Sequence, residues 1–290
     1  KKFWRGKKVL ITGHTGFIGR NIARHLSLQG HEIIGLSRSS SEESFYAAQI
    51  SCDLSDEYAC NSLAANKVLD GVKIVIHASS ILADKVNIAS FGLLYSNIHI
   101  IENTVKLCEL LQPKTLINLS SFAVYPNIDG DFSETSQTSV GHSPEGLYAL
   151  SKICSENIFD FYLSKLMCVS HLRLGQVFGE GMRDDRIYSI FLKELKDTNK
   201  ITVWGNGERI SNFISIAKLL NIFQIFIENK VPGIYNIGEY NVSYMDIAQI
   251  IIDEFGNNKS EITLINKGSK AKFNLNLDKL RELLARYPLQ

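Results

Sequence analysis

The feature that most constrains the fold is a short apolar run that leads directly into a glycine-rich turn. Residues 8–12 (Lys-Val-Leu-Ile-Thr) have the composition of a buried strand, and residues 17–29 have helical periodicity. Between them, Gly13, Gly16 and Gly19 allow a tight turn and a close approach of phosphate oxygens, while the start of the helix offers free N–H groups. The segment therefore predicts a pyrophosphate-binding turn, with a purely structural glycine turn as the alternative.

Further strands and helices alternate along the first part of the chain. Strands are expected at 31–36, 73–77, 115–120 and 169–174, and helices at 97–111 and 147–166. Such alternation predicts a parallel sheet with helical crossovers. After Gly175 the rhythm breaks, with helices expected at 187–196, 216–229, from Ser243 onward and at 278–286, and short strands at 201–204 and 234–237.

We therefore predict an α/β protein with a Rossmann-type, doubly wound parallel sheet and a small C-terminal α/β substrate lobe. Residues 1–175 and 212–238 are expected to form the NAD(P)-binding Rossmann domain. Residues 176–211 and 239–290 are expected to form a lobe over the carboxyl edge of the sheet, where ligands of such sheets bind.

Composition excludes several classes of function. The chain has 290 residues and a formal net charge of +1, so it has no global field that would attract nucleic acid or an anionic membrane. No apolar run approaches the length of a membrane span, and the first residues do not resemble a signal peptide. The five cysteines have no paired or zinc-ligand spacing, which predicts reduced thiols, no metal site and a cytoplasmic location.

A tyrosine and a lysine supply a candidate acid–base group. Tyr148 and Lys152 are four residues apart on one predicted helix, so their side chains can converge. A nearby ammonium lowers the pKa of a phenol, which can then exchange a proton with a carbonyl or alcohol oxygen while hydride moves at the same carbon. Ser121, at a strand end, can hydrogen-bond that oxygen, and Asn97, at the expected start of a helix, can orient the lysine through water. The alternatives are an exposed helix pair and two capping residues.

The end of the second expected strand bears on the cofactor. NAD-preferring proteins usually carry Asp or Glu there, whereas this chain has Ser37 followed by Arg38. Arginine can bind a 2′-phosphate through charge-assisted hydrogen bonds, which favours NADP over NAD. A solvated surface arginine is the alternative. Asp53 lies where a carboxylate can meet the adenine amino group, or it is a turn residue.

These motifs together resemble an extended short-chain dehydrogenase/reductase of the NAD-dependent epimerase/dehydratase family, which acts on nucleotide sugars. The resemblance is carried by residues 12–19, 53–54, 77–80, 97, 120–125, 144–152 and 235–238. It implies that Ser121, Tyr148 and Lys152 are catalytic, and that a homodimer forms through the helices around 97–111 and 147–166. With the residues already discussed, the expected cofactor contacts are Gly13, Thr15, Gly16, Phe17, Ile18, Gly19, Ser37, Arg38, Asp53, Leu54, Ala78, Ser79, Ser80, Tyr148 and Lys152.

Residues that differ from the family pattern reduce the number of reactions to consider. Sugar-nucleotide dehydratases carry Asp-Glu directly after the catalytic hydroxyl, and epimerase/reductases resembling GDP-fucose synthase carry a cysteine two residues after it. Phe122 and Ala123 stand at these positions and cannot transfer protons. Carbonyl reduction and 4-epimerisation by hydride transfer remain, and an NADP preference favours the reductase. Ser121 and Phe122 are still expected to contact the substrate.

The substrate end also departs from the family. Gln176 stands where the family has asparagine, and Ser211 stands where a family arginine clamps the substrate pyrophosphate. Arg209, two residues earlier and on the same face of an expected strand, is a candidate replacement, as are Arg183 and Arg186. The alternative is that all three are solvated surface charges.

One resemblance concerns the nucleotide. Residues 3–17 are similar to the opening of CDP-glucose 4,6-dehydratases, which favours a CDP-linked substrate. The leading hypothesis is therefore an NADPH-dependent reductase of a nucleotide-linked 4-keto-6-deoxyhexose in surface-polysaccharide synthesis. The alternatives are an NAD-dependent nucleotide-sugar 4-epimerase, a reductase of a non-sugar ketone, and a non-enzymatic NAD(P)-binding regulator.

Overall fold

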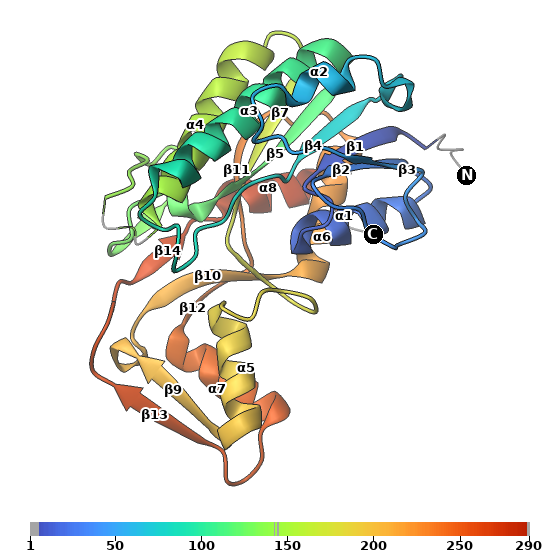
Figure 1. Cartoon of the computed structure of the whole chain (residues 1–290). Helices are drawn as coiled ribbons and strands as arrows, with labels where there is room; N and C mark the ends of the chain where they lie inside the picture. The colour runs from blue at the N-terminus through green and yellow to red at the C-terminus, as the bar shows by residue number, and fades with distance from the viewer. Residues whose placement is uncertain (1–5, 142, 144, 289–290) are drawn as a thin grey trace.

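The computed structural model describes residues 6–141, 143 and 145–288. Its central sheet has seven parallel strands in the order β11-β7-β5-β4-β1-β2-β3 (Figure 1). These strands are β1 (Lys8–Thr12), β2 (Glu32–Ser37), β3 (Ala48–Ser51), β4 (Ile74–His77), β5 (Thr115–Ser121), β7 (Cys168–Leu174) and β11 (Gly233–Ile237). Because the order runs outward from β1 in both directions, crossover helices lie on both faces. The predicted Rossmann-type α/β fold is confirmed.

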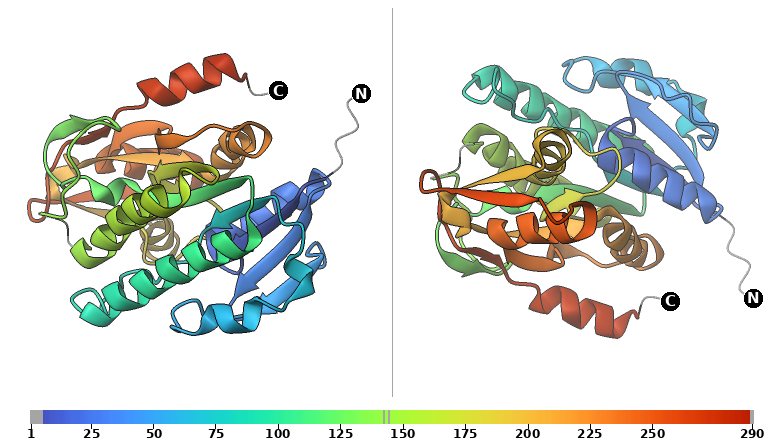
Figure 2. Two further views of the ribbon diagram at one scale, coloured as in Figure 1. Left: turned by 90° about the horizontal axis from the view of Figure 1, so that it is seen from above. Right: turned by 90° about the horizontal axis from the view of Figure 1, so that it is seen from below.

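Neighbouring residues of each strand face opposite helical layers. Val9 and Ile11 pack with α1 (Phe17–Leu28), α6 (Ile216–Glu228) and α8 (Asp278–Arg286). Leu10 packs instead with α2 (Ala59–Leu63), α3 (Phe91–Leu111) and α4 (Gly146–Leu163). Figure 2 shows α3 and α4 side by side, with α8 on the opposite side of the molecule. Burial on both faces explains why these strands are nearly continuous apolar runs.

The described residues also form three smaller sheets. β8 (Gln176–Phe178), β10 (Ile210–Ser215) and β12 (Tyr240–Ser243) form one, β9 (Lys200–Trp204) pairs with β13 (Glu261–Ile265), and β6 (Gly130–Phe132) pairs with β14 (Phe273–Leu275). Helices α5 (Ile187–Thr198) and α7 (Tyr244–Phe255) enclose a separate apolar cluster that includes Phe191, Ile201 and Ile251. The elements β9, β13, α5 and α7 lie below the central sheet in the view of Figure 1.

Several expected boundaries are confirmed and others are wrong. The helix at 278–286 has the expected ends, and Ser243 and Asp246 form the capping box predicted for α7. However, α3 begins at Phe91, where Ser90 caps it by accepting a hydrogen bond from the Gly92 N–H (3.1 Å). Asn97 therefore lies inside the helix and not at its start. The proposed division into two domains remains a prediction.

Most of the elements missing from the sequence prediction are short, although β13 has five residues. They include β3, with Gln49 and Ser51 at a sheet edge, and the three-residue strands β6, β8 and β14. They also include the 3₁₀ turns η1 (Lys67–Leu69), η2 (Phe122–Val124) and η3 (Gly205–Gly207). Such segments are too short for periodicity to identify them. Within the described ranges, no helix is long and apolar enough to cross a membrane.

Candidate active site

The glycine-rich turn has the geometry that a pyrophosphate site needs. Gly13 has a φ of 66°, and a Cβ there would lie 2.8 Å from the carbonyl oxygen of Ala78. A Cβ on Gly19 would lie 2.5 Å from the carbonyl oxygen of Gly13. Gly16 caps α1 without a side-chain hydrogen bond, and the first turn of α1 carries no acid. The N–H groups at this helix start can therefore bind an anion.

A cavity of about 780 Å³ extends from this turn along the carboxyl ends of the strands. It is lined by nearly all of the residues that the sequence analysis selected. They are Gly13, Thr15, Gly16, Phe17, Ile18, Gly19, Ser37, Arg38, Asp53, Leu54, Ala78, Ser79, Ser80, Ser121, Phe122, Tyr148, Lys152, Gln176, Arg183 and Arg209. Asn97 is the exception. The structure thus brings the candidate cofactor, catalytic and substrate residues into one space.

The three candidate catalytic side chains come from two adjacent elements. Ser121 ends β5, and its Oγ accepts a hydrogen bond from the Ala123 N–H (3.1 Å), so its own proton remains free to be donated. Tyr148 and Lys152 lie on α4, with the Lys152 Nζ 5.5 Å from the centre of the Tyr148 ring. The same Nζ donates a hydrogen bond to the carbonyl oxygen of Leu119 on β5 (2.9 Å). The helix and the strand end are therefore held together by the lysine itself.

Electrostatics at Tyr148 differ from the sequence expectation. Burial raises the pKa of the Tyr148 phenol above its ordinary value, Glu145 adds to that rise, and Arg186 and Arg183 oppose it. The expected lowering of this pKa by Lys152 is therefore not found, because desolvation of the phenolate dominates. The Tyr148 phenol therefore keeps its proton near neutral pH and can donate it as an acid. Burial also lowers the pKa of the Lys152 ammonium to about 8, against the opposing effect of Glu156.

Asn97 lies behind the candidate catalytic lysine and not in the main cavity. Its Oδ1 accepts hydrogen bonds from the Ile81 N–H (2.8 Å) and the Ser80 hydroxyl (3.2 Å), so it holds the loop that follows β4. Together with Lys152 and Ser155 it lines a second cavity of about 10 Å³. That volume suits a single water molecule, so a water-mediated contact with the lysine fits this geometry.

At the cofactor end, Ser37 and Arg38 lie where the sequence predicts. The Ser37 hydroxyl donates a hydrogen bond to the Ser39 carbonyl oxygen (2.6 Å). Thr15 Oγ1 lies 3.3 Å from the Ser37 Oγ. Arg38 is exposed and forms no ion pair with any described residue. Asp53 Oδ1 accepts hydrogen bonds from the backbone and hydroxyl of Ser55 (2.9 and 2.7 Å). Asp53 is thus a turn residue that also lines the cavity.

At the substrate end, the amide of Gln176 reaches the position of the family arginine. Its Nε2 donates to the hydroxyl oxygens of Ser211 (2.9 Å) and Tyr244 (3.4 Å). The Arg209 guanidinium lies 5.2 Å from the centre of the Tyr244 ring. Arg209 directly precedes β10, which begins at Ile210, and its carbonyl oxygen accepts a hydrogen bond from the Tyr244 N–H (2.9 Å). The Arg209 guanidinium is at the cavity wall.

The other two candidate arginines are neutralised by neighbours. Arg183 pairs with Asp185, and Arg186 pairs with Glu145 (3.3 Å). Arg209 makes no ion pair in the part of the chain that the structure describes. It is therefore the best placed of the three for an anionic substrate group.

The lining residues that sequence reasoning missed include two with ionisable side chains, Tyr244 and Glu145. Tyr244 is the first residue of α7, and Glu145 precedes α4. Neither carries a spacing signal, because tertiary packing alone brings them to the cavity. Residues 3–5 of the CDP-dehydratase-like opening, and Pro144 of the family-like segment, lie outside the described residues.

Comparison with known proteins identifies the family. The profile of the "NAD dependent epimerase/dehydratase family" matches residues 9–238. The chain belongs to this family. Among curated relatives, it is 25% identical to a dTDP-4-dehydro-6-deoxy-D-allose reductase of Streptomyces sp, over 87% of this chain and 82% of the relative. It is 24% identical to dTDP-D-glucose 4,6-dehydratase of Dictyostelium discoideum, over 85% of this chain but only 62% of that relative's length.

Solved structures agree on the fold. A UDP-N-acetylglucosamine 4-epimerase from Methanobrevibacter ruminantium superposes with a TM-score of 0.82 at 20% identity, covering 97% of this chain and 92% of the other. A variant of UDP-glucuronic acid 4-epimerase from Bacillus cereus gives 0.80 at 20% identity, covering 98% and 94%. At these identities the likeness concerns the epimerase-like fold alone, and it supports the sequence-based resemblance.

Proposed function

We propose that the protein is an NADPH-dependent reductase of a nucleotide-linked 4-keto-6-deoxyhexose. The observation that carries the proposal is the meeting of Ser121, Tyr148 and Lys152 at one cavity, with apolar Phe122 and Ala123 beside them. Ser121 hydrogen-bonds the carbonyl oxygen, Tyr148 donates a proton to it, and Lys152 holds the cofactor ribose. The cofactor supplies hydride when it is bound.

A neutral Tyr148 phenol fits the proton donation that a reduction requires. A reductase needs a neutral phenol that gives its proton to the developing alkoxide, and burial favours that state here. A 4-epimerase begins with the opposite transfer, in which the tyrosine removes a proton from an alcohol. Phe122 packs against Phe273 (ring centres 5.4 Å apart) and offers no acid or base for dehydration.

The cofactor proposal rests on the end of β2. Exposed Arg38 lines the cavity beside Ser37, and neither residue repels a 2′-phosphate. A reductase that exchanges NADPH for NADP on each turnover fits this arrangement better than one that retains NAD. The glycine turn at Gly13 and the N-terminus of α1 would hold the pyrophosphate.

For the substrate, we propose that Arg209 binds the pyrophosphate and that Gln176 and Tyr244 border it. The opening of the chain favours a CDP-linked sugar, while the reductase relatives carry dTDP-linked names. The assay must therefore compare both nucleotides. We propose that the reduced deoxyhexose is a precursor in surface-polysaccharide synthesis.

We also propose a homodimer formed through α3 and α4. Tyr95 of α3 is 62% exposed and Phe161 of α4 is 79% exposed, which is unusual for large apolar side chains on two adjacent helices. Burying them against a second copy would remove this surface from water.

The decisive experiment is NADPH consumption with CDP-, dTDP-, GDP- and UDP-linked 4-keto-6-deoxyhexoses, each repeated with NADH. Tyr148→Phe should lower turnover by about 10²–10⁴-fold and leave NADPH binding intact. Tyr58→Phe, at an exposed tyrosine distant in sequence, is the matched control. Retained turnover in Tyr148→Phe would refute the catalytic assignment. No consumption, together with epimer interconversion by protein that carries bound NAD, would establish the 4-epimerase instead.

A further inference from the structure

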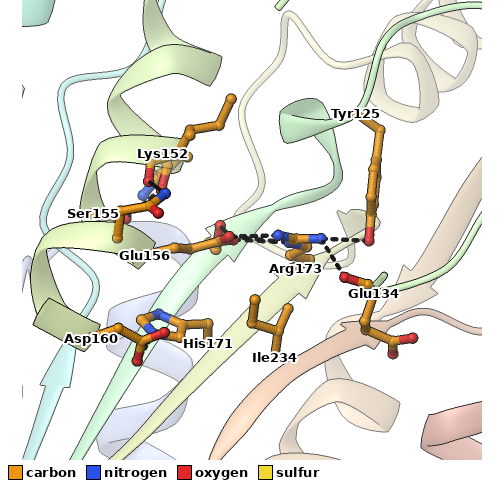
Figure 3. Close-up of polar contacts among 12 residues, drawn as sticks. Tyr125, Glu134, Lys152, Ser155, Glu156, Asp160, His171, Arg173 and Ile234 are labelled. Carbon is orange, nitrogen blue, oxygen red and sulfur yellow. Dashed lines mark hydrogen bonds and ion pairs between the residues drawn. The ribbon is translucent and has the colours of Figure 1, made fainter. Parts of the chain in front are cut away.

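A buried ion pair lies directly behind the candidate catalytic residues. Arg173 of β7 and Glu156 of α4 are only 3% and 4% exposed. The Arg173 Nη2 donates to Glu156 Oε2 (2.7 Å), and its Nε donates to Oε1 (3.0 Å), so the contact is bidentate (Figure 3). This is the geometry in which guanidinium and carboxylate groups interact most strongly.

The carboxylate of this pair joins the two elements that carry the site. Glu156 Oε1 also accepts a 2.5 Å hydrogen bond from the hydroxyl of Ser120, the residue before Ser121 on β5. Glu156 lies one helical turn after Lys152 on α4, on the same helix face. Glu156 thus adds a second link between the end of β5 and α4, beside the hydrogen bond from Lys152 to the Leu119 carbonyl oxygen.

The guanidinium extends the cluster to a third strand. Arg173 Nη1 donates to the hydroxyl oxygen of Tyr125 (2.8 Å), and that hydroxyl donates to Asn236 Oδ1 (2.8 Å) on β11. Arg173 Nη1 also donates to the carbonyl oxygen of Glu134 (3.4 Å). Figure 3 shows Arg173 between Glu156 on one side and Tyr125 and Glu134 on the other. Each nitrogen of the guanidinium and each oxygen of the carboxylate therefore has a hydrogen-bond partner, which offsets the cost of burying the two charges.

Stability alone does not account for charges at this place. A buried ion pair loses the solvation of both ions, and apolar side chains of similar volume often stabilise a protein as well or better. A third buried ionisable side chain lies beside this ion pair. It is Lys152, which is 6% exposed.

We propose that Glu156 and Arg173 are a positioning pair, which fixes Ser121 relative to Lys152 and balances the charge of the Lys152 ammonium. This inference rests on the proposed reduction, in which Lys152 acts as a cation. Neither side chain lines the main cavity, so both act through Ser120, Ser121 and Lys152 and not on the substrate.

The charges around Lys152 support this role. Tyr148 on its own helix is neutral, and His77 of β4 is also neutral because burial lowers its pKa to about 3. Arg173 of β7 lies on the far side of Glu156. Among the described residues, Glu156 is the negative charge that opposes the effect of burial on the pKa of Lys152. Without it, the ammonium would lose its proton at a lower pH.

The test removes both charges together, so that neither remains buried and unpaired. In Glu156→Met/Arg173→Met, the pKa of the Lys152 Nζ is followed by NMR on protein with ¹³C-labelled lysine, with Lys152→Met used to assign the signal. We expect that pKa to fall by about one unit or more, and the alkaline limb of kcat/KM to move to lower pH by the same amount. Glu156→Gln, which keeps the side-chain volume, should shift the pKa in the same direction and serves if the double variant does not fold.

Ser170→Ala is the matched control, because Ser170 lies on β7 and donates a buried hydrogen bond to the Val231 carbonyl oxygen (2.6 Å), away from the site. It should leave both the pKa and the pH profile unchanged. A folded double variant or Glu156→Gln variant with the wild-type Lys152 pKa would overturn the inference. Because the NMR measurement needs no substrate, that outcome is distinct from failure of the proposed reaction, which would appear as absence of turnover in the wild type.

Discussion

The Nζ of Lys152 donates a 2.9 Å hydrogen bond to the carbonyl oxygen of Leu119, two residues before Ser121. This contact fixes the ammonium at the end of β5. The same Nζ lies 5.5 Å from the centre of the Tyr148 ring. The lysine therefore links α4 to β5 and also lies beside the tyrosine.

The first prediction concerns the pH dependence of reduction. The reaction needs the Lys152 ammonium and the neutral Tyr148 phenol. Burial lowers the pKa of Lys152 to about 8, whereas it raises the pKa of Tyr148. We expect kcat/KM to fall as pH rises through about 8, because the lysine loses its proton while the tyrosine keeps its own. In Lys152→Arg, the guanidinium does not titrate in this range, so any residual activity should lack this limb. A wild-type profile that stays flat to high pH would contradict the prediction.

The second prediction concerns the cofactor. Arg38 is exposed at the end of β2 and is free of ion pairs within the described ranges, so it can bind a 2′-phosphate. Arg38→Ala should weaken NADPH binding by roughly 10- to 100-fold, the loss expected for hydrogen bonds to a charged group, and leave NADH binding unchanged. Fluorescence titration with both cofactors measures this. Arg24→Ala, at an exposed arginine of α1 that does not line the cavity, is the control. Equal losses for the two cofactors would reject the 2′-phosphate assignment.

Much of the cofactor half could be predicted because its signals are local. The run before Gly13, the glycine spacing and the apolar strands each determine nearby backbone geometry, so β1, α1 and the cavity edge follow from the sequence. Tyr148 and Lys152 were found in the same way, since their spacing on one helix decides their common face.

The rest depends on contacts between distant segments. The position of Asn97 inside α3 is one example, because nothing in its own neighbourhood shows that the helix extends back to Phe91. The approach of the Arg209 guanidinium to Tyr244 is another, because the two residues belong to different elements. The raised pKa of Tyr148 likewise reflects burial by the whole fold, which spacing alone cannot reveal.

The third prediction concerns Arg209. As the one candidate arginine without an acidic partner among the described residues, it can give its full charge to a pyrophosphate. Arg209→Ala should raise KM for the nucleotide sugar by about 10-fold or more, with a smaller effect on kcat, and should not alter NADPH binding. Arg183→Ala, whose guanidinium pairs with Asp185, should have the weaker effect. If Arg183→Ala raises KM more than Arg209→Ala does, the pyrophosphate contact belongs to Arg183.

The fourth prediction concerns acid stability. His14 is fully buried, neither of its ring nitrogens has a partner among the described residues, and its ring packs edge-on against Tyr46 at 4.7 Å. Burial lowers its pKa to about 4 from an ordinary value of 6.5. Between these values the unfolded chain binds a proton that the folded protein does not, so the free energy of unfolding should fall by about 1.4 kcal/mol per pH unit as pH decreases.

Replacing the ring nitrogens tests this. His14→Phe keeps an aromatic ring against Tyr46 and removes the titration, so its free energy of unfolding should depend less on pH between 6 and 4, by about one proton. At pH 8, His14 is neutral in both the folded and the unfolded chain. The free energies of unfolding of the variant and the wild type should therefore differ little there, which makes that pH the internal control. Urea denaturation at several pH values provides the measurement. Identical pH dependence in the two proteins would show that His14 gains its proton in the folded state as readily as in the unfolded chain.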